Sequence, residues 1–169
     1  DLVGITGTNG KTTTATLLHD LYSSIGHKCG LISTVTNKVA DRSIKATHTT
    51  PNPVSLNSLL NEMVNEGCTH CFMEVSSHAV VQNRIHGVQF SGGVFTNISH
   101  DHLDYHKTFD AYIKAKKKFF DDLPSDSFAL VNIDDKNGSV MQQNTSARKY
   151  NFALKTPADF KAKIIENEI

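Results

Sequence analysis

The chain has 169 residues, of which 17 are Lys or Arg and 17 are Asp or Glu, so its formal net charge is zero. This length supports one domain with a hydrophobic core of its own. A balanced charge provides no overall positive field, so we expect no nucleic-acid or membrane partner. No apolar run approaches the roughly 20 residues needed to cross a bilayer, and no signal peptide is visible.

An apolar strand is predicted at residues 2–6, and it leads through a glycine-rich loop into a helix at 11–25. Residues 4–13 read Gly-Ile-Thr-Gly-Thr-Asn-Gly-Lys-Thr-Thr. Glycines allow backbone N–H groups to converge on phosphate oxygens, the lysine adds a mobile charge, and the next hydroxyl can bind Mg²⁺. The loop therefore indicates binding of ATP or GTP. The residues expected to hold the nucleotide are Gly7, Thr8, Asn9, Gly10, Lys11, Thr12 and Thr13.

The loop departs from the common phosphate-binding pattern at one position. That pattern places a glycine five residues before Gly10, where this chain has Ile5. The alternative is a loop that only resembles a nucleotide site. The order of strand, loop and helix favours phosphate binding.

Strand and helix patterns alternate along the rest of the chain. Apolar segments predict strands at 29–34, 70–75, 90–96, 127–133 and, more weakly, 148–153. Further helices are predicted at 54–66, 108–122 and 136–144, whereas 35–52 is expected to be irregular. This alternation predicts an α/β fold, with a mostly parallel sheet flanked by helices on both faces.

The three cysteines, Cys29, Cys68 and Cys71, provide no disulfide framework and suggest a reducing compartment such as the cytoplasm. Cys68 and Cys71 have the spacing of a redox pair or of half a zinc site. A core position is favoured for Cys71, because it begins an apolar strand and the chain has no second pair of this spacing.

Ligands of open parallel sheets collect beyond the carboxyl ends of the strands. Four polar clusters are expected there, at 7–12, 47–51, 74–78 and 97–106. Glu74 ends its strand, and a carboxylate beside a phosphate loop commonly holds the Mg²⁺ of the nucleotide. The alternative is a solvated glutamate at a strand end.

The cluster at 97–106 reads Asn-Ile-Ser-His-Asp-His-Leu-Asp-Tyr-His and suggests metal or phosphate chemistry. A zinc site formed by His100, His102 and His106 is one possibility. A Mg²⁺ site with one histidine among oxygen ligands is favoured beside a phosphate loop. A polar loop without a ligand is the third alternative.

Lys116 interrupts an apolar stripe in the predicted helix at 108–122. The stripe requires an apolar residue at this position, whereas Lys114, Lys117 and Lys118 fall to the sides or outward. Desolvation lowers the pKa of an inward lysine and makes its amine reactive. Such a lysine could pair with a phosphate or take up CO₂ as a carbamate that binds Mg²⁺. The alternative is a lysine whose ammonium reaches solvent at the edge of the stripe.

Two further groups are weaker candidates. Arg84, two residues after Gln82, could bind a carboxylate or phosphate with its guanidinium, or could be a surface arginine. Thr49 and Thr50 offer hydroxyl donors in a predicted loop.

Together these segments resemble the Mur ligases, the ATP-dependent ligases of peptidoglycan precursor synthesis, and most closely the branch that adds the third peptide residue. The segments that carry the resemblance are Gly-Thr-Asn-Gly-Lys-Thr-Thr at 7–13, Thr-Thr-Pro at 49–51, Met-Glu-Val-Ser-Ser-His at 73–78, Gln82 with Arg84, the cluster at 97–106, and Lys116. The folylpolyglutamate synthetases share the loop but match these segments less well. A nucleotide-binding module without catalysis is a further alternative.

The resemblance implies that residues 1–169 are part of the central ATP-binding domain of a three-domain cytoplasmic enzyme, expected to be a monomer. The UDP-binding and amino-acid-binding domains would lie outside this chain, so the chain alone is expected to be inactive. ATP would phosphorylate the D-glutamate carboxylate of UDP-MurNAc-L-Ala-D-Glu. A diamino acid, diaminopimelate or lysine, would then displace phosphate from the acyl phosphate.

The resemblance also implies residue roles. Lys11, Lys116 and His102 would take part in catalysis. Thr12 and Glu74 would hold the Mg²⁺ of ATP, and His102 with a carbamylated Lys116 would hold a second ion. The residues that would hold the muramyl dipeptide are Thr49, Thr50, Ser76, Gln82 and Arg84.

Overall fold

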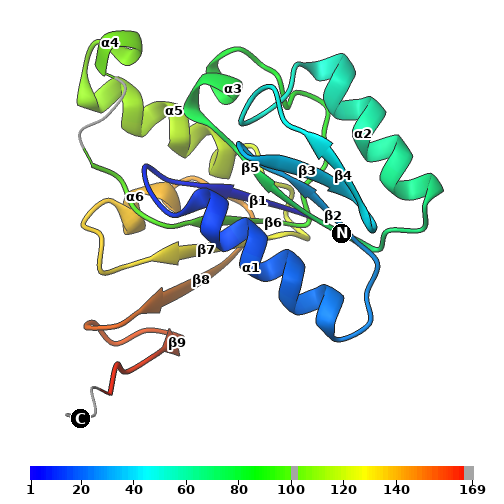
Figure 1. The fold of residues 1–169 in the computed structure, drawn as a ribbon. Helices are drawn as coiled ribbons and strands as arrows, with labels where there is room; N and C mark the ends of the chain where they lie inside the picture. The colour runs from blue at the N-terminus through cyan, green and yellow to red at the C-terminus, as the bar shows by residue number, and fades with distance from the viewer. Residues whose placement is uncertain (100–102, 166–169) are drawn as a thin grey trace.

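The computed structural model describes residues 1–99 and 103–165, and these form an α/β fold around one sheet (Figure 1). The strands are β1 (Leu2–Thr6), β2 (Cys29–Ile32), β3 (Thr36–Val39), β4 (Arg42–Lys45), β5 (His70–Glu74), β6 (Gly92–Phe95), β7 (Phe128–Asn132), β8 (Arg148–Ala153) and β9 (Phe160–Lys161). The helices are α1 (Lys11–Ser24), α2 (Pro53–Asn65), α3 (Ser77–Val81), α4 (Leu103–His106), α5 (Phe109–Asp121) and α6 (Gly138–Met141). The predicted fold class is confirmed.

The strand order in the described part is β4-β3-β2-β5-β1-β6-β7-β8-β9. All neighbouring strands are parallel except for β2 with β3 and β3 with β4. Central strand β1 pairs with β5 on one side and with β6 on the other, so its carboxyl end lies between theirs. Ligands of doubly wound sheets bind at such a point, where the chain turns from one half of the sheet to the other.

The prediction that 35–52 is irregular is wrong for its first half, which forms the hairpin of β3 and β4. In β3, buried Asn37 and Val39 alternate with half-buried Thr36 and Lys38. The alternation was hidden because one of the two buried side chains is polar. Asn37 Oδ1 accepts the backbone N–H of Ser33, which satisfies the buried amide oxygen.

Helices cover both faces of the sheet. On one face α1 packs against β1, β2 and β5, with Ala15 fully buried in the smaller core cluster. On the other face lies the larger cluster, to which α2, α3, α5 and α6 contribute. The stripe of α5 buries Tyr112, Phe119 and Phe120 there, as its sequence predicts. No helix in residues 1–99 or 103–165 has the length and apolar character needed to cross a membrane.

Local signals explain where the helices begin and end. The side chain of Asn52 accepts the N–H of Ser55 at the start of α2, and Gly67 follows its end with φ +78°. Short helices α3 and α4 and strand β9 were not predicted, because a segment of five residues or fewer shows little periodicity. Helix α6 is shorter than the predicted 136–144.

Candidate active site

A pocket of about 560 Å³ opens at the carboxyl ends of β1 and β5 and at the first turn of α1. It brings together segments far apart in sequence: the glycine-rich loop, the loop before α2 and the end of β5. The predicted site residues that line it are Thr8, Asn9, Gly10, Lys11, Thr12, Thr13, Thr49, Thr50, Glu74, Ser76 and Arg84. Gly7 and Gln82 are not in its lining but bond to Lys11 and Arg84, which are. Lys116 lies one step further away and contacts Gly7.

The glycine-rich loop enters α1 through Gly10, whose φ of +83° is in the left-handed region that favours glycine. No side chain caps the start of α1, so its first N–H groups remain available to an anion in the pocket. The ammonium of Lys11 folds over the loop and donates to the carbonyls of Gly7 and Thr8, both at 2.9 Å. The loop thus presents positive charge and backbone donors to the pocket.

The segment after β6 holds this loop in place. Asn97 accepts from the N–H of Asn9 and donates to its carbonyl, both at 3.0 Å. The N–H of Thr8 donates to the backbone carbonyl of Asn97, and Thr96 Oγ1 donates to the carbonyl of Asn9. A methyl group on Gly7 would lie 1.9 Å from Thr96 Oγ1, so this close approach requires glycine. Sequence reasoning missed this support, because it depends on contacts between residues about 90 positions apart.

Glu74 is buried, with 1% of its surface exposed, so the alternative of a solvated strand-end glutamate is wrong. Its Oε1 accepts from Thr12 Oγ1 and from the backbone N–H of Thr34, both at 2.7 Å. Its Oε2 lies 3.2 Å from Thr34 Oγ1. A carboxylate and a hydroxyl side by side beneath a phosphate loop are the hard oxygen donors that Mg²⁺ prefers, so these residues fit that ion.

Lys116 points inward, as the stripe of α5 predicts, and is 1% exposed. Its ammonium donates to the carbonyl of Gly7 at 2.8 Å and lies 4.6 Å from the ring centre of Tyr112. The Tyr112 hydroxyl in turn lies 3.2 Å from Thr8 Oγ1. Helix α5 therefore contacts the phosphate loop from below at two points. The alternative in which the ammonium reaches solvent is wrong.

The neighbouring lysines of α5 differ from one another. Lys114 and Lys118 are exposed, as predicted. Each forms an ion pair with an aspartate one turn away. Lys117 was also expected to be solvated, but only 12% of its side chain is exposed, and it forms an ion pair with Asp121 at 2.6 Å.

A hydrogen-bonded group connects the loop before α2 with the end of β5. Thr50 Oγ1 donates to the carbonyl of Glu74 at 2.8 Å, and Arg84 Nη1 donates to the carbonyl of Thr50 at 2.9 Å. Arg84 Nε donates to Gln82 Oε1, so Gln82 supports the guanidinium from outside the pocket lining. Ser76 caps α3 by accepting the N–H of Ala79. Arg84 is thus held at the pocket wall.

Of the predicted metal-binding histidines, the structure describes only His106. It is buried, and its Nε2 lies 2.8 Å from Ser77 Oγ. His100 and His102 lie outside the described residues, so neither the zinc nor the magnesium prediction for them is tested. Within 1–99 and 103–165, no group of three His, Cys, Asp or Glu side chains is arranged to hold a metal ion.

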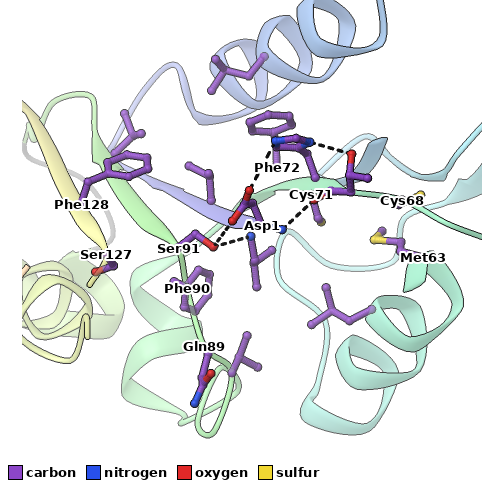
Figure 2. A pocket seen from close by; sticks show the side chains of 18 of the residues that line it. Asp1, Met63, Cys68, Cys71, Phe72, Gln89, Phe90, Ser91, Ser127 and Phe128 are labelled. Atoms are coloured by element: carbon purple, nitrogen blue, oxygen red, sulfur yellow. Dashed lines mark hydrogen bonds and ion pairs between the residues drawn. The ribbon is translucent and has the colours of Figure 1, made fainter. Parts of the chain in front are cut away.

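A larger pocket, of about 1030 Å³, lies at the opposite, amino ends of β1 and β5. Figure 2 shows its apolar lining, with Phe72, Phe90 and Phe128 around it and Cys71 close to Asp1. Cys71 is buried, which confirms its predicted core position, and this desolvation raises the pKa of its thiol. Despite its size, this pocket lacks the loop donors that a phosphate requires, so the chemistry is assigned to the smaller pocket.

The profile of the Mur ligase middle domain matches residues 5–168. The chain belongs to the Mur ligase family. It is 66% identical over 164 residues to a UDP-N-acetylmuramoyl-L-alanyl-D-glutamate–2,6-diaminopimelate ligase of Cytophaga hutchinsonii, covering 97% of this chain and 34% of that protein. The chain therefore spans about a third of the length of this curated relative.

Solved structures share the fold. A structure of a UDP-N-acetylmuramoyl-L-alanyl-D-glutamate–2,6-diaminopimelate ligase is similar with a TM-score of 0.84 and 32% identity, over 95% of this chain and 33% of that one. E. coli FolC in complex with DHPP and ADP has a TM-score of 0.66 at 18% identity, over 89% of this chain and 42% of that one. This second likeness concerns the fold alone.

The sequence did not predict a role for Thr34, which contacts two walls of this Mur ligase pocket. Thr34 follows β2 and lines the pocket, where it contacts both Glu74 and Thr49. A single threonine after a strand carries no motif, and both contacts depend on how distant segments fold together.

Proposed function

We propose that the protein carrying this chain is an ATP-dependent ligase that joins 2,6-diaminopimelate to the D-glutamate carboxylate of UDP-MurNAc-L-Ala-D-Glu. One observation carries the proposal: phosphate-binding, metal-binding and carboxylate-binding groups converge on one pocket at the centre of the sheet. The names of the similar ligases supply the two substrates. In this proposal the chain is the central part of a three-domain protein.

ATP binds in this proposal with its phosphates against the start of α1. Residues Gly7 to Thr13 surround the phosphates, and the dipole of α1 favours their charge. The N–H groups from Gly10 to Thr13 face the phosphates, because those of Thr8 and Asn9 already donate to Asn97. Lys11 leaves its loop carbonyls and pairs with phosphate oxygens, because its side chain is long and flexible.

Thr12 and Glu74 hold the Mg²⁺ of the nucleotide, since their oxygens lie 2.7 Å apart beneath the loop. When bound, the ion supplies charge neutralisation on the transferring phosphate. The burial of Glu74 keeps its carboxylate in a low-dielectric position, where its attraction for a cation is stronger than in water.

The acid substrate lies on the opposite wall in this proposal. Arg84 binds the D-glutamate carboxylate or a neighbouring oxygen, and Thr49 and Ser76 donate to the peptide. Thr50 keeps its bond to the Glu74 carbonyl and holds Arg84 beside the peptide. Gln82 orients Arg84 through the bond to its Nε. Two anions must approach in the first step, so their repulsion is the barrier that these cationic groups reduce.

The reaction then proceeds in two displacements. A carboxylate oxygen of D-glutamate attacks the γ-phosphorus, the bond to the bridging oxygen of ADP breaks, and an acyl phosphate forms. The neutral amine of diaminopimelate attacks the acyl carbon, inorganic phosphate leaves with the C–O bonding electrons, and the nitrogen loses a proton. Lys11 stabilises the negative charge that develops on the phosphate in both steps.

We also propose that Lys116 acts as a carbamate. Its neutral amine attacks the carbon of CO₂, one proton is released, and a carboxylate forms on Nζ. The remaining N–H can keep its bond to the Gly7 carbonyl. The modified side chain, together with His102, would hold a second Mg²⁺ near the acyl phosphate. The burial of Lys116 supports this proposal, since burial favours the neutral amine that reacts.

We place the enzyme in the cytoplasm as a monomer. Its dependence on ATP supports this location, as do the free thiols of Cys29, Cys68 and Cys71.

The test is phosphate release by the full-length protein with ATP, Mg²⁺ and UDP-MurNAc-L-Ala-D-Glu, with diaminopimelate or lysine added singly and the product identified by mass spectrometry. We expect release that requires both the dipeptide and diaminopimelate. Lysine as the better substrate would overturn the assigned amino acid. Release that requires a folate and glutamate would support the folate-type alternative, and nucleotide binding without substrate-dependent release would support the non-catalytic one.

A further inference from the structure

Thr34 connects the two halves of the pocket. It follows β2 in the chain and lies 40 positions before Glu74. Its side chain is exposed to the pocket rather than packed in the core. Its hydrogen bonds go to the pocket residues Glu74 and Thr49.

On the nucleotide side, Thr34 contacts both oxygens of Glu74. The backbone N–H donates to Oε1 at 2.7 Å, and Oγ1 lies 3.2 Å from Oε2. Two contacts to one carboxylate fix the rotation of its plane. The Oε1 that accepts from Thr34 also accepts from Thr12, so Thr34 helps to aim this carboxylate beneath the loop.

On the acid-substrate side, Thr34 Oγ1 lies 3.0 Å from Thr49 Oγ1. A hydroxyl has one proton, so Thr34 can donate either to Glu74 or to Thr49, but not fully to both. The choice between these acceptors depends on the charge at Glu74, because an ionised carboxylate without a cation is the stronger acceptor.

We propose that Thr34 is a positioning residue that couples nucleotide binding to acid-substrate binding, an inference that rests on the proposed function. With Mg²⁺ bound, the Glu74 carboxylate would be the weaker acceptor, and the Thr34 hydroxyl would turn its hydrogen bond from Glu74 to Thr49. Thr49 Oγ1 then accepts the hydrogen bond from Thr34. The hydroxyl proton of Thr49 is therefore free to point into the pocket and to donate to the peptide. Coupling of this kind is reciprocal, so bound peptide also strengthens binding of the metal nucleotide.

The test uses the full-length protein and isothermal calorimetry, in three variants. Thr34→Val removes the hydroxyl and keeps the backbone N–H and the shape. Thr34→Ser restores a hydroxyl. Thr36→Val is the matched control, because it removes a similar hydroxyl outside the pocket. The Thr36 hydroxyl donates to the carbonyls of Asn37 and Ile44 in the neighbouring hairpin. Thermal unfolding of each variant checks that all of them are folded.

The main measurement is the Kd of UDP-MurNAc-L-Ala-D-Glu with and without a non-hydrolysable ATP analogue and Mg²⁺. In the unmodified protein we expect the metal nucleotide to tighten peptide binding by about tenfold, within the usual range for coupled sites. Thr34→Val should reduce this factor to about two or less, whereas Thr34→Ser and Thr36→Val should retain it. A factor that is unchanged in Thr34→Val would overturn the proposal.

A second measurement separates this inference from the proposed function. Mg²⁺-dependent binding of the ATP analogue alone, without peptide, tests the contact of Thr34 with Glu74. We expect Thr34→Val to weaken it several-fold, by analogy with the loss of a residue that orients a metal ligand. If the unmodified protein binds no peptide, the proposed function fails. An unchanged Mg²⁺ dependence in Thr34→Val would then reject the positioning role as well.

Discussion

Lys11 and Lys116 donate to the same acceptor, the carbonyl oxygen of Gly7, at 2.9 and 2.8 Å. Two ammonium groups on one oxygen repel each other, and burial of Lys116 strengthens this repulsion. Either an anion between them or the conversion of Lys116 into an anionic carbamate would relieve it. Both ammonium groups therefore contribute positive potential at the phosphate loop.

The first prediction concerns Lys116. Lys116→Arg keeps the positive charge but cannot form a carbamate, and Lys116→Met keeps most of the shape without an amine. We expect turnover to fall by at least about 100-fold in both, the usual cost of removing one electrostatic contributor to a transition state. With ¹³C-bicarbonate, NMR should show a carbamate signal in the unmodified protein and none in either variant. Near-normal turnover in Lys116→Arg would contradict the carbamate.

The second prediction concerns Glu74. Glu74→Gln keeps the size of the side chain but removes the charge that would attract Mg²⁺. We expect Mg²⁺-dependent affinity for an ATP analogue to fall by about 10- to 100-fold, measured by calorimetry. Glu62→Gln is the matched control, since Glu62 forms its ion pair with Arg42 on the surface. Equal affinities in the two variants would show that Glu74 does not hold the metal.

The third prediction concerns the close approach at Gly7. In Gly7→Ala the new methyl group meets Thr96 Oγ1 at 1.9 Å, so the loop must shift. We expect a loss of about 1–3 kcal/mol in the free energy of unfolding. Nucleotide affinity should fall as well.

Gly10→Ala provides the comparison, because its methyl group meets open space and only the left-handed φ is strained. It should cost about 1 kcal/mol. Thermal and urea unfolding measure both variants. An equal loss in the two would mean that strain, not contact with Thr96, makes Gly7 necessary.

The fourth prediction concerns pH. Asp134 accepts the backbone N–H groups of Leu154, Lys155 and Thr156 at 2.7–3.0 Å, and these bonds hold the pKa of its carboxyl well below 3.8. A lowered folded-state pKa stabilises the fold at pH values above 3.8, and this contribution is lost as the pH falls toward the folded-state value. Asp134→Asn should therefore lower the Tm at pH 7, and the difference from the unmodified protein should shrink below about pH 4.

Thermal unfolding between pH 2.5 and 7 measures this difference. Asp41→Asn, in the exposed turn between β3 and β4, is the control and should leave the Tm nearly unchanged. A constant difference across the pH range would mean that Asp134 does not act through its charge.

Much of the fold could be predicted because buried parallel strands have apolar sequences with clear boundaries, as in β1 and β5. Lys116 could be singled out because it breaks a regular stripe. The hairpin at 36–45 was missed because edge strands tolerate polar residues. Asn97 was expected near the site as part of the cluster at 97–106, but its bonds to Asn9 were not predicted. Those bonds and the contacts of Thr34 depend on the sheet order, which no local pattern records.

The brace formed by Thr96 and Asn97 has a consequence for the kinetics of binding. Both residues bond to the backbone of Asn9, so contacts within the protein itself hold the phosphate loop in shape. A preorganised loop loses little conformational entropy on binding. Encounter with ATP should then lead directly to a bound complex, without a slow rearrangement of the loop, and the lifetime of that complex should set the affinity.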